Sequence, residues 1–485
     1  MRKKIKNIFF IFLIMFLYSF SQNEVRILQS NYLQNHIINK KKFDMFCGNV
    51  VAQYKDHKLY CDTILISKNG KYIKASSKNY SKIIDSEGAK IQSKKIEFFK
   101  NDSIINFTER VLFKKKKQEI HTNDLNYNPE NKIIYYKNGG KLIDGGNTIS
   151  SKNAIYHTKD EFGQFSQKVK IKTNSYRIES ENLDLDNKND IIFLNSRSTI
   201  KSEDLIIKGD WGFLNKKDES IQVWGHGEIN SEERKIYSDS IFINKLKETQ
   251  LSGNVEINEK KNIKIYCQNY FKKDEYSEFK GNPIIQFSSE NGDFRIEGEK
   301  MTMNHNDSIL VITNKTYISS DSIQGKCKNS IFDLKSEIIS MIENPVLWTK
   351  KNQISGDTIY VYTKNEALDS IYIPNNSFII SKNTDKHYNQ IKGNKLEGKF
   401  KKGKLNNIKL KGNTILKYFE KNKKKEIIGL NDVICSSILI YMKENQINNI
   451  SFKSKPKATY TPKNLIEDKS LILEGFLNRF SEKKY

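Results

Sequence analysis

The chain has 485 residues, with 82 Lys and Arg against 57 Asp and Glu and a formal net charge of +25. Only eight of the basic residues are arginine, the residue that proteins usually recruit to bind phosphates. The charge therefore permits anion binding but is not evidence for it, and we expect no nucleic-acid partner. Helical periodicity is weak, which argues against a helical bundle. Beyond Leu17 no apolar run reaches the roughly 18 residues of a membrane-spanning helix.

The first residues predict export. A basic start between Arg2 and Lys6 precedes an apolar run from Ile8 to Leu17, and the small residues Ser19 and Ser21 fit a cleavage site. We expect residues 1–21 to be a signal peptide that is removed after it has directed the chain to export.

One short phrase recurs thirteen times along the rest of the chain. It is usually an Ile, any residue, a small residue, two polar residues, and two apolar residues spaced by one, as in Ile178 to Leu185. Six of the twelve steps between successive small residues are 29 residues long, which indicates a repeat array. The small residues are Cys61, Ser93, Thr122, Ser151, Ser180, Ser202, Ser238, Cys267, Gly298, Cys327, Gly356, Gly393 and Cys435.

Alternation of apolar and polar residues within the phrase predicts strands. The apolar positions two before and three after the small residue have opposite parity, so a flat strand would send them to opposite faces. Burying both requires a bulge or corner between them, and a small side chain suits that bend. We therefore expect more than half of the chain in strands, almost no helix after residue 21, and a bend near every small residue.

A second phrase, often about a dozen residues earlier, pairs Gly with Asn, as at Gly48-Asn49, Gly253-Asn254 and Gly412-Asn413. Both residue types tolerate positive φ, so the pair predicts a turn that opens a strand. Gly225-His226 stands at the equivalent place before Ser238, and we interpret His226 as a turn residue too. Each repeat then consists of two or three short strands and a turn.

Four of the five cysteines (Cys61, Cys267, Cys327 and Cys435) occupy the small-residue position, and Cys47 precedes a Gly-Asn pair. This placement indicates cysteine used as a small buried residue. A disulfide between Cys47 and Cys61 stays open as an alternative, because these two cysteines share a repeat.

No motif for catalysis is evident. Acidic residues often follow the small residue, as at Asp62, Glu181 and Asp357, where we interpret them as corner residues. The chain contains no phosphate-binding loop, nucleophile elbow or zinc-site spacing. We expect no catalytic residues, no metal site and no cofactor.

The phrases and their order carry a family resemblance. Gly48 to Val50 opens a strand before the first phrase, and near the C-terminus Gly429 to Cys435, Ile438 to Met442 and Ile447 to Ile450 precede Leu473 to Phe476. This pattern resembles the OstA-like (organic-solvent-tolerance-like) family of periplasmic lipopolysaccharide-transport bridge proteins, in its long Bacteroidetes type. The resemblance covers nearly the whole chain after the predicted signal peptide.

The resemblance implies an all-β fold, an elongated repeat array that forms an open, twisted β-jelly roll or solenoid of OstA-like modules. Its interior would hold the acyl chains of lipopolysaccharide, while the sugar-phosphate head stays in water. We expect modules at residues 22–187, 188–345 and 346–455, followed by a non-repeat tail at residues 456–485.

Apolar residues that follow the small residues would then form a lipid-binding trough, with lysines at its rim. They are Ile64, Ile66, Ile96, Phe98, Leu125, Leu183, Leu185, Leu205, Ile207, Ile241, Ile243 and Ile359. The implied partners are lipopolysaccharide or a related lipid, the outer-membrane and inner-membrane components of its transport, and further copies of the chain joined end to end. The expected location is the periplasm, in association with the outer membrane.

Two alternatives stay open. An exported β-solenoid scaffold or adhesin without lipid cargo would fill its interior with interdigitated side chains, whereas a conduit needs room for acyl chains. A polysaccharide-active β-helix enzyme would need acids clustered on one face, and the sequence does not show such a cluster.

Pro456 and Pro462 predict that regular strand stacking stops at Pro456, because proline cannot donate to a sheet ladder. A polar stretch follows them. Deletion of residues 463–485 is therefore expected to cost little stability.

Overall fold

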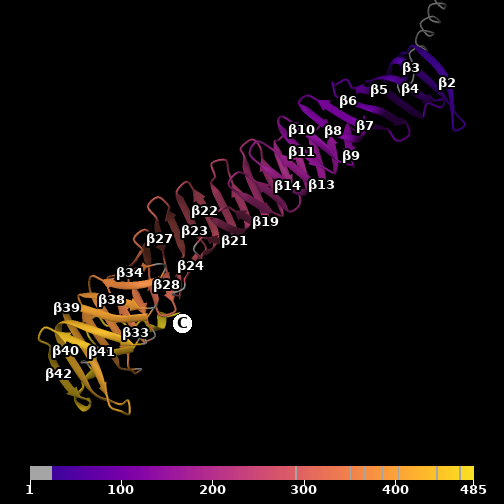
Figure 1. Ribbon diagram of the computed structural model, residues 1–485. Helices are drawn as coiled ribbons and strands as arrows, with labels where there is room; N and C mark the ends of the chain where they lie inside the picture. Colours follow the sequence, from indigo (N-terminus) through magenta and orange to yellow (C-terminus); the bar gives the residue numbers. More distant parts are fainter. Residues whose placement is uncertain are drawn as a thin grey trace, which may run out of the picture. The chain divides into compact units, whose positions relative to one another are not determined.

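The computed structural model describes residues 25–260, 262–289, 292–349, 351–364, 367–384, 386–401, 404–443, 446–468 and 471–484. The predicted signal peptide lies outside these residues. The chain divides into two compact units, Met1–Val223 and Trp224–Tyr485. Strands make up most of the described chain and α-helices are absent from it, which confirms the predicted all-β class (Figure 1).

The first unit contains eighteen described strands, and β19 (Ser220–Asn230) spans the boundary between the units. The eighteen strands are β1 (Arg26–Gln29), β2 (Tyr32–Ile38), β3 (Lys41–Tyr54), β4 (His57–Ser67), β5 (Tyr72–Ile84), β6 (Lys90–Phe99), β7 (Ile104–Lys115), β8 (Gln118–Asn128), β9 (Ile133–Tyr136), β10 (Gly140–Asp144), β11 (Asn147–Ser151), β12 (Asn153–His157), β13 (Phe162–Lys172), β14 (Arg177–Asp186), β15 (Ile191–Leu194), β16 (Ser198–Lys201), β17 (Ile206–Gly209) and β18 (Trp211–Asn215).

The second unit continues with strands and two short 3₁₀ turns near its end. They are β20 (Arg234–Ile243), β21 (Thr249–Glu259), β22 (Ile263–Lys273), β23 (Tyr276–Lys280), β24 (Ile284–Ser289), β25 (Gly292–Glu297), β26 (Lys300–Asn304), β27 (Ile309–Thr313), β28 (Thr316–Ser320), β29 (Gln324–Cys327), β30 (Asn329–Asp333), β31 (Ile338–Ile342), β32 (Val346–Trp348), β33 (Asn352–Ser355), β34 (Thr358–Lys364), β35 (Ala367–Ile373), β36 (Ser377–Lys382), β37 (Tyr388–Gly393), β38 (Lys395–Lys401), β39 (Lys404–Lys421), β40 (Ile427–Lys443), β41 (Gln446–Lys453), β42 (Lys457–Pro462), η1 (Lys463–Leu465) and η3 (Phe480–Glu482).

Each unit is built from two sheet faces that share their longest strands. In the first unit β8 pairs with both β9 and β10, and β13 pairs with both β11 and β12. The first half of a long strand therefore lies in one sheet and its second half in the other. All the strand pairings are antiparallel in this part of the chain. This arrangement is that of a β-jelly roll whose core lies between the two sheets.

The predicted corners are present where the two halves meet. In β14, Ile178 and Leu183 flank Ser180 and both are fully buried. The pairing register of β13 with β14 shifts between Ser166 and Val169, where two residues of β13 stand opposite Glu181. The same kind of bulge separates the halves of β7 and β8 and of β21 and β22. The apolar residues two before and three after the small residue are thus both buried because a bulge lies at the corner, as predicted.

The small residue has a second role besides fitting a tight bend. The hydroxyl of Ser180 donates to the carbonyl oxygen of Asn182 at 2.9 Å, two residues along the corner. Ser93, Ser151 and Ser238 make the equivalent bond at 2.7 to 2.8 Å, and Cys327 makes it through its thiol at 3.1 Å. Ser, Thr and Cys therefore recur because each is small and can donate to the carbonyl oxygen two residues along, which ties the two sides of the bend together.

The corner predicted at Ser202 is wrong. Ser202 lies in the hairpin turn that joins β16 to β17, where its N–H donates to the carbonyl of Leu205. The corner of this repeat falls between β17 and β18, at Gly209. Ser180, Gly209 and Ser238 are then separated by 29 residues in each step, so the period continues unbroken through this region.

The Gly-Asn pairs are bulges more often than turns that open a strand. Gly48-Asn49, Gly253-Asn254 and Gly412-Asn413 lie inside β3, β21 and β39, with φ between 45° and 80° at every one of these residues. Gly225-His226 adopts the same left-handed pair inside β19, with φ of 74° and 50°. The pair thus supplies the two bulge residues that stand opposite one residue of the partner strand. Gly and Asn recur there because both tolerate positive φ.

The sheet also extends past Pro456. β42 pairs with β40 from Gly429↔Pro462 to Ile434↔Lys457. Both prolines lie at the limits of this strand, so neither removes an internal ladder bond. The segment after Pro462 leaves the sheet, but it is not loose: the buried side chains of Gln353 and Gln390 hydrogen-bond to its backbone.

Candidate functional site: the apolar interior

Ten of the twelve predicted trough residues are buried between the sheets. Ile64, Leu183, Ile241 and Ile359 have no exposed surface, and the other buried members are at most 7% exposed. Ile66 and Leu205 are only half-buried. The buried ten are Ile64, Ile96, Phe98, Leu125, Leu183, Leu185, Ile207, Ile241, Ile243 and Ile359.

Two of the twelve residues lie away from the row of positions that the predicted trough requires. Leu205 belongs to the hairpin turn after Ser202, and Ile207 faces Ile200 in the sheet that holds the first halves of the corner strands. In this repeat the trough positions, three and five residues after the corner residue Gly209, are Gly212 and Leu214. These two residues pair with Leu194 and Ile192. The signal that could have found them is the unbroken 29-residue period, which requires Gly209 as the small residue.

Apolar side chains form continuous cross-strand rows on both sheets. In the first unit one row runs through Leu142, Ile149, Ile171, Ile178, Ile200 and Ile207, each paired with the next. In the second unit a row runs through Ile241, Leu251, Tyr270, Phe279, Met301 and Ile312. Side-chain contact between such rows, rather than any single pair, stabilises each interior.

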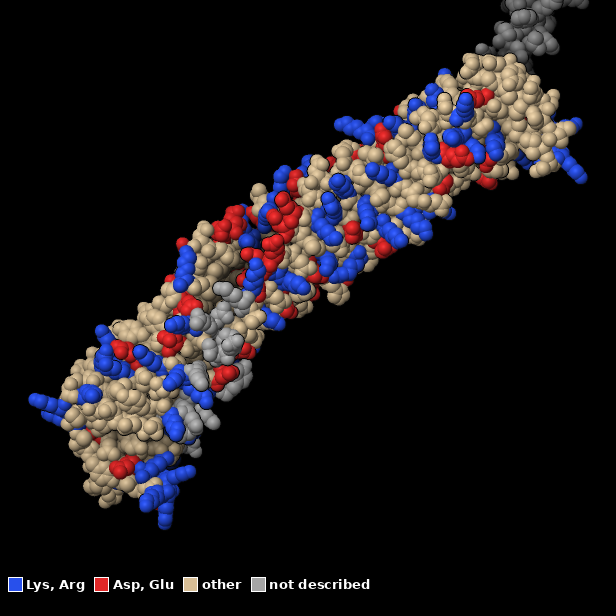
Figure 2. All heavy atoms as spheres, viewed as in Figure 1, with Lys and Arg blue, Asp and Glu red and all other residues tan. Residues whose placement is uncertain are grey.

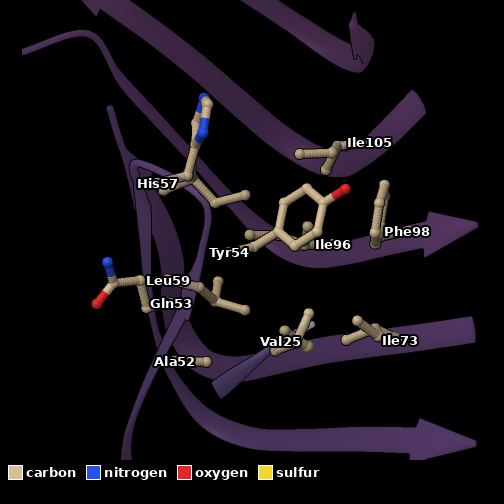
Figure 3. A pocket seen from close by; sticks show the side chains of 12 residues that line it. Val25, Ala52, Gln53, Tyr54, His57, Leu59, Ile73, Ile96, Phe98 and Ile105 are labelled. Atoms are coloured by element: carbon tan, nitrogen blue, oxygen red, sulfur yellow. The ribbon is translucent and has the colours of Figure 1, made fainter. Parts of the chain in front are cut away.

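A cavity of about 50 Å³ lies inside the first unit, close to β1. Its lining is almost wholly apolar and comes from both sheets, with Ala52 and Leu59 on one side and Ile73, Ile96 and Phe98 on the other (Figure 3). Ile83 pairs with Leu59 and belongs to the same side. The ring of Tyr54 lies against Phe98, with 5.2 Å between the ring centroids. An apolar cavity of about 150 Å³ holds a single benzene molecule, so this space is too small for an acyl chain unless the lining side chains move.

His57 is a buried polar member of the cavity lining, which also contains Gln53. It is 6% exposed; its Nδ1 lies 2.8 Å from Asp56 Oδ1, although poorly aligned for a hydrogen bond, and its Nε2 lies 3.5 Å from the hydroxyl of Tyr127. Ser86 donates a hydrogen bond to Asp56, which lowers the pKa of that carboxyl. Sequence reasoning missed Tyr54 and His57 because they end β3 and begin β4 on either side of the turn, outside the repeated phrase.

The first and last strands expose unpaired edges among the described residues. β1 and β2 both pair with β3, and β41 and β42 both pair with β40. β2 is exposed along its whole length and carries Tyr32, Leu33 and Ile37, which are 54%, 54% and 70% exposed. An edge strand with apolar side chains is a template for pairing with another chain.

Basic and acidic side chains are interspersed over the visible face of each unit, as Figure 2 shows. Several lysines are neutralised locally: Lys55 lies 3.1 Å from Glu130, and Lys115 lies 2.9 Å from Glu87. The positive charge is therefore spread along the surface, not gathered into one phosphate-binding patch on this face.

The cysteines and acids do not form a reactive centre. All five cysteines are buried and free. Burial raises the pKa of Cys61, Cys267 and Cys327 to about 12, so their thiols stay protonated. Within the described ranges no group of three His, Cys, Asp or Glu side chains is placed to hold a metal ion. Nor does that part of the chain contain a helix able to cross a membrane.

Comparisons with known proteins agree with this architecture. Residues 22–181 match the model of the OstA-like protein family, and residues 148–367 match that of the LptA/(LptD N-terminal domain) LPS transport protein family. No curated protein matched the chain.

Among solved structures, LptH, the LptA homologous periplasmic component of the conserved lipopolysaccharide transport device from Pseudomonas aeruginosa, is 13% identical. The alignment covers 32% of this chain and 96% of LptH, with a TM-score of 0.19, which is too low to carry an argument. The two family matches overlap and together span residues 22–367, and the chain therefore belongs to the OstA-like family of lipopolysaccharide-transport proteins.

Proposed function

We propose that this protein binds the acyl chains of lipopolysaccharide between its two sheets in the periplasm and takes part in moving the lipid to the outer membrane. The observation that carries the proposal is the continuous apolar row described inside each unit of an OstA-like chain. Each buried methylene contributes about 0.8 kcal/mol, so an apolar interior can hold an acyl chain without any chemistry.

The closed interior defines how lipid would enter. Because the cavity near β1 is only about 50 Å³, acyl chains must displace Tyr54 and its neighbours or part the two sheets. Entry at this end is favoured because the interior there is already incompletely filled. The head group would stay at the surface beside the turn between β3 and β4. There Lys55 and Lys132 could release their carboxylate partners, Glu130 and Glu87, and bind phosphates instead.

Partners would join at the exposed edges. The outer edge of β2 and the outer edges of β41 and β42 can each accept a strand from a transport component or from a second copy of the chain. Such pairing would continue the apolar interior from one protein to the next.

Photo-crosslinking tests the proposal. A photoreactive amino acid placed at Leu185 or Ile241, both buried in the interior, should crosslink to lipopolysaccharide in cells. The same amino acid at Lys170, whose side chain is 68% exposed on β13, is the matched control and should not. Crosslinking at all three positions alike, or at none, would contradict an interior lipid site.

A second test uses charge. Leu185→Asp and Ile241→Asp should abolish co-purification of lipid, whereas Lys55→Gln should only weaken it and reduce its dependence on salt. Thermal melting must first show that the variants are folded.

The alternative function is a scaffold or adhesin without lipid cargo. The observation that favours it is the dense packing of the interior, where ten of the predicted trough residues are almost fully buried against protein. Folded Asp variants that retain as much lipid as the unaltered chain, together with crosslinking that does not depend on position, would favour this alternative.

A further inference from the structure

One outward-facing row of the second unit is buried although it lies opposite the core. Trp348, Gln353, Ile380 and Gln390 are cross-strand neighbours on β32, β33, β36 and β37, and none is more than 1% exposed. The core-facing row beside them runs through Leu347, Ile354, Ile379 and Ile391. A buried glutamine on the outer face needs partners from something that covers the sheet.

The glutamines follow the repeat. The position three residues before the corner residue is usually charged, as at Lys58, Arg177 and Lys235. In three successive repeats it is instead glutamine, namely Gln324, Gln353 and Gln390. The exchange of a charged side chain for an uncharged amide coincides with the part of the sheet that is covered.

The cover is the C-terminal segment Leu471–Lys484, which we call the strap. Gln390 donates to the carbonyl of Leu471 at 2.8 Å and accepts from the N–H of Leu473 at 2.7 Å. Gln353 repeats this geometry six residues further along, donating to the carbonyl of Leu477 and accepting from the N–H of Arg479, both at 2.7 Å. Each amide thus engages the strap as the peptide group of a neighbouring strand would.

The end of the strap is held by one more glutamine and by charge. Gln324 accepts from the N–H of Lys484 at 3.2 Å, and the Nζ of Lys484 lies 2.6 Å from Glu297. Glu482 lies 2.7 Å from both Lys326 and Arg479, and its carbonyl accepts from the hydroxyl of Tyr317.

Between these ends Phe476 packs on Tyr388, with 5.5 Å between the ring centroids. The strap therefore crosses the sheet from β37 back to β25.

We propose that this outer face of the second unit is a peptide-docking site, and that the strap is its resident ligand, recognised through Gln324, Gln353 and Gln390. The backbone-to-backbone hydrogen bonds of the described strap residues run only within the strap or to the residues just before it, as from Leu471 to Asp468 and from Phe476 to Leu473. Its attachment to the sheet is therefore encoded in side chains. The strap joins three repeats on the side away from the interior, so it can fix their spacing while leaving the interior to any ligand.

Separation of the strap from the body tests this inference in the full chain. A protease recognition sequence inserted between Ile466 and Glu467 allows the strap to be cut after folding. We expect the cut segment to stay with the body during gel filtration and to exchange with a labelled synthetic peptide of residues 471–484. A Gln353→Ala, Gln390→Ala body should bind that peptide at least tenfold more weakly.

Gln286 provides the matched control. It lies on the same outward row, opposite Arg295, beyond the end of the strap, so Gln286→Ala should leave peptide affinity unchanged. A second measurement does not depend on how body variants fold: a peptide carrying Leu473→Pro and Arg479→Pro lacks the two N–H groups that the glutamines accept, and should bind no better than a scrambled peptide. Loss of the strap on cleavage without rebinding of peptide, or equal binding by the proline peptide, would overturn the inference.

Discussion

Ile178 and Leu183 lie five residues apart in β14 and are both fully buried, although simple alternation would send them to opposite faces of the strand. The corner at Ser180 reconciles the two positions, because the strand leaves one sheet and enters the other there. The same relationship recurs at Ile236 and Ile241 and at Ile354 and Ile359. The corner residue is therefore the element that converts a flat repeat into a closed interior.

Removal of the corner hydroxyl should destabilise the first unit. Ser180→Val loses the bond to the Asn182 carbonyl and places a branched side chain beside the hydroxyls of Ser196 and Ser198, so we expect a loss of about 1–3 kcal/mol. Ser150→Ala, at a half-buried position on β11, is the control and should change stability by less than about 0.5 kcal/mol. Denaturant unfolding of both variants measures the difference.

Two variants test whether Gly209, and not Ser202, is the corner residue of its repeat. A Cβ atom at Gly209 would lie 2.6 Å from the Cβ of Val223, so Gly209→Ala should cost about 1–3 kcal/mol through overpacking. Ser202→Ala removes only a hydroxyl from a hairpin turn and should cost much less. The reverse order of the two unfolding midpoints would contradict the assignment of the corner.

The cysteines should be inert in the folded protein. Because burial raises the pKa of Cys61, Cys267 and Cys327 to about 12, a thiol reagent at pH 8 meets almost no thiolate at these positions. After unfolding without a reductant, all five cysteines should react. Recovery of only three reactive thiols from exported protein would show that Cys47 and Cys61 are joined.

Binding of the strap should depend on pH through Glu482. Hydrogen bonds from Arg479 and Lys326 lower the pKa of this carboxyl from 4.5 to about 2. A group whose pKa falls on binding stabilises the bound state fully above its free pKa and loses that contribution as pH decreases through its bound pKa. Affinity of the synthetic strap peptide should thus be constant from pH 7 to about pH 5 and decrease below pH 4.5.

A Glu482→Gln peptide is the control for this dependence. It should bind more weakly at pH 7, because the amide cannot form the ion pairs with Lys326 and Arg479. It should also show a smaller decrease on acidification, because an amide does not titrate in this range. Parallel pH profiles for the two peptides would assign the dependence to another carboxylate.

Sequence alone determined the features that depend on local pattern. The strand class, the repeat, the corner between Ile178 and Leu183 and the burial of residues such as Ile64 and Ile241 follow from alternation and from a small residue at fixed spacing. The first reason is that side-chain direction alternates along a strand. The second is that a change of parity can be absorbed only by a bulge.

Tertiary structure decided what local pattern leaves open. Ser202 and Gly209 both stand in phrases that fit a corner, and only the pairing of β16 with β17 shows that Ser202 lies in a hairpin. The strap meets Gln390, Gln353 and Gln324 from 81 to 160 residues away along the chain, so no local signal marks the contact. Whether an apolar interior is open or filled likewise depends on how the facing sheets pack, and here packing leaves about 50 Å³ beside Phe98.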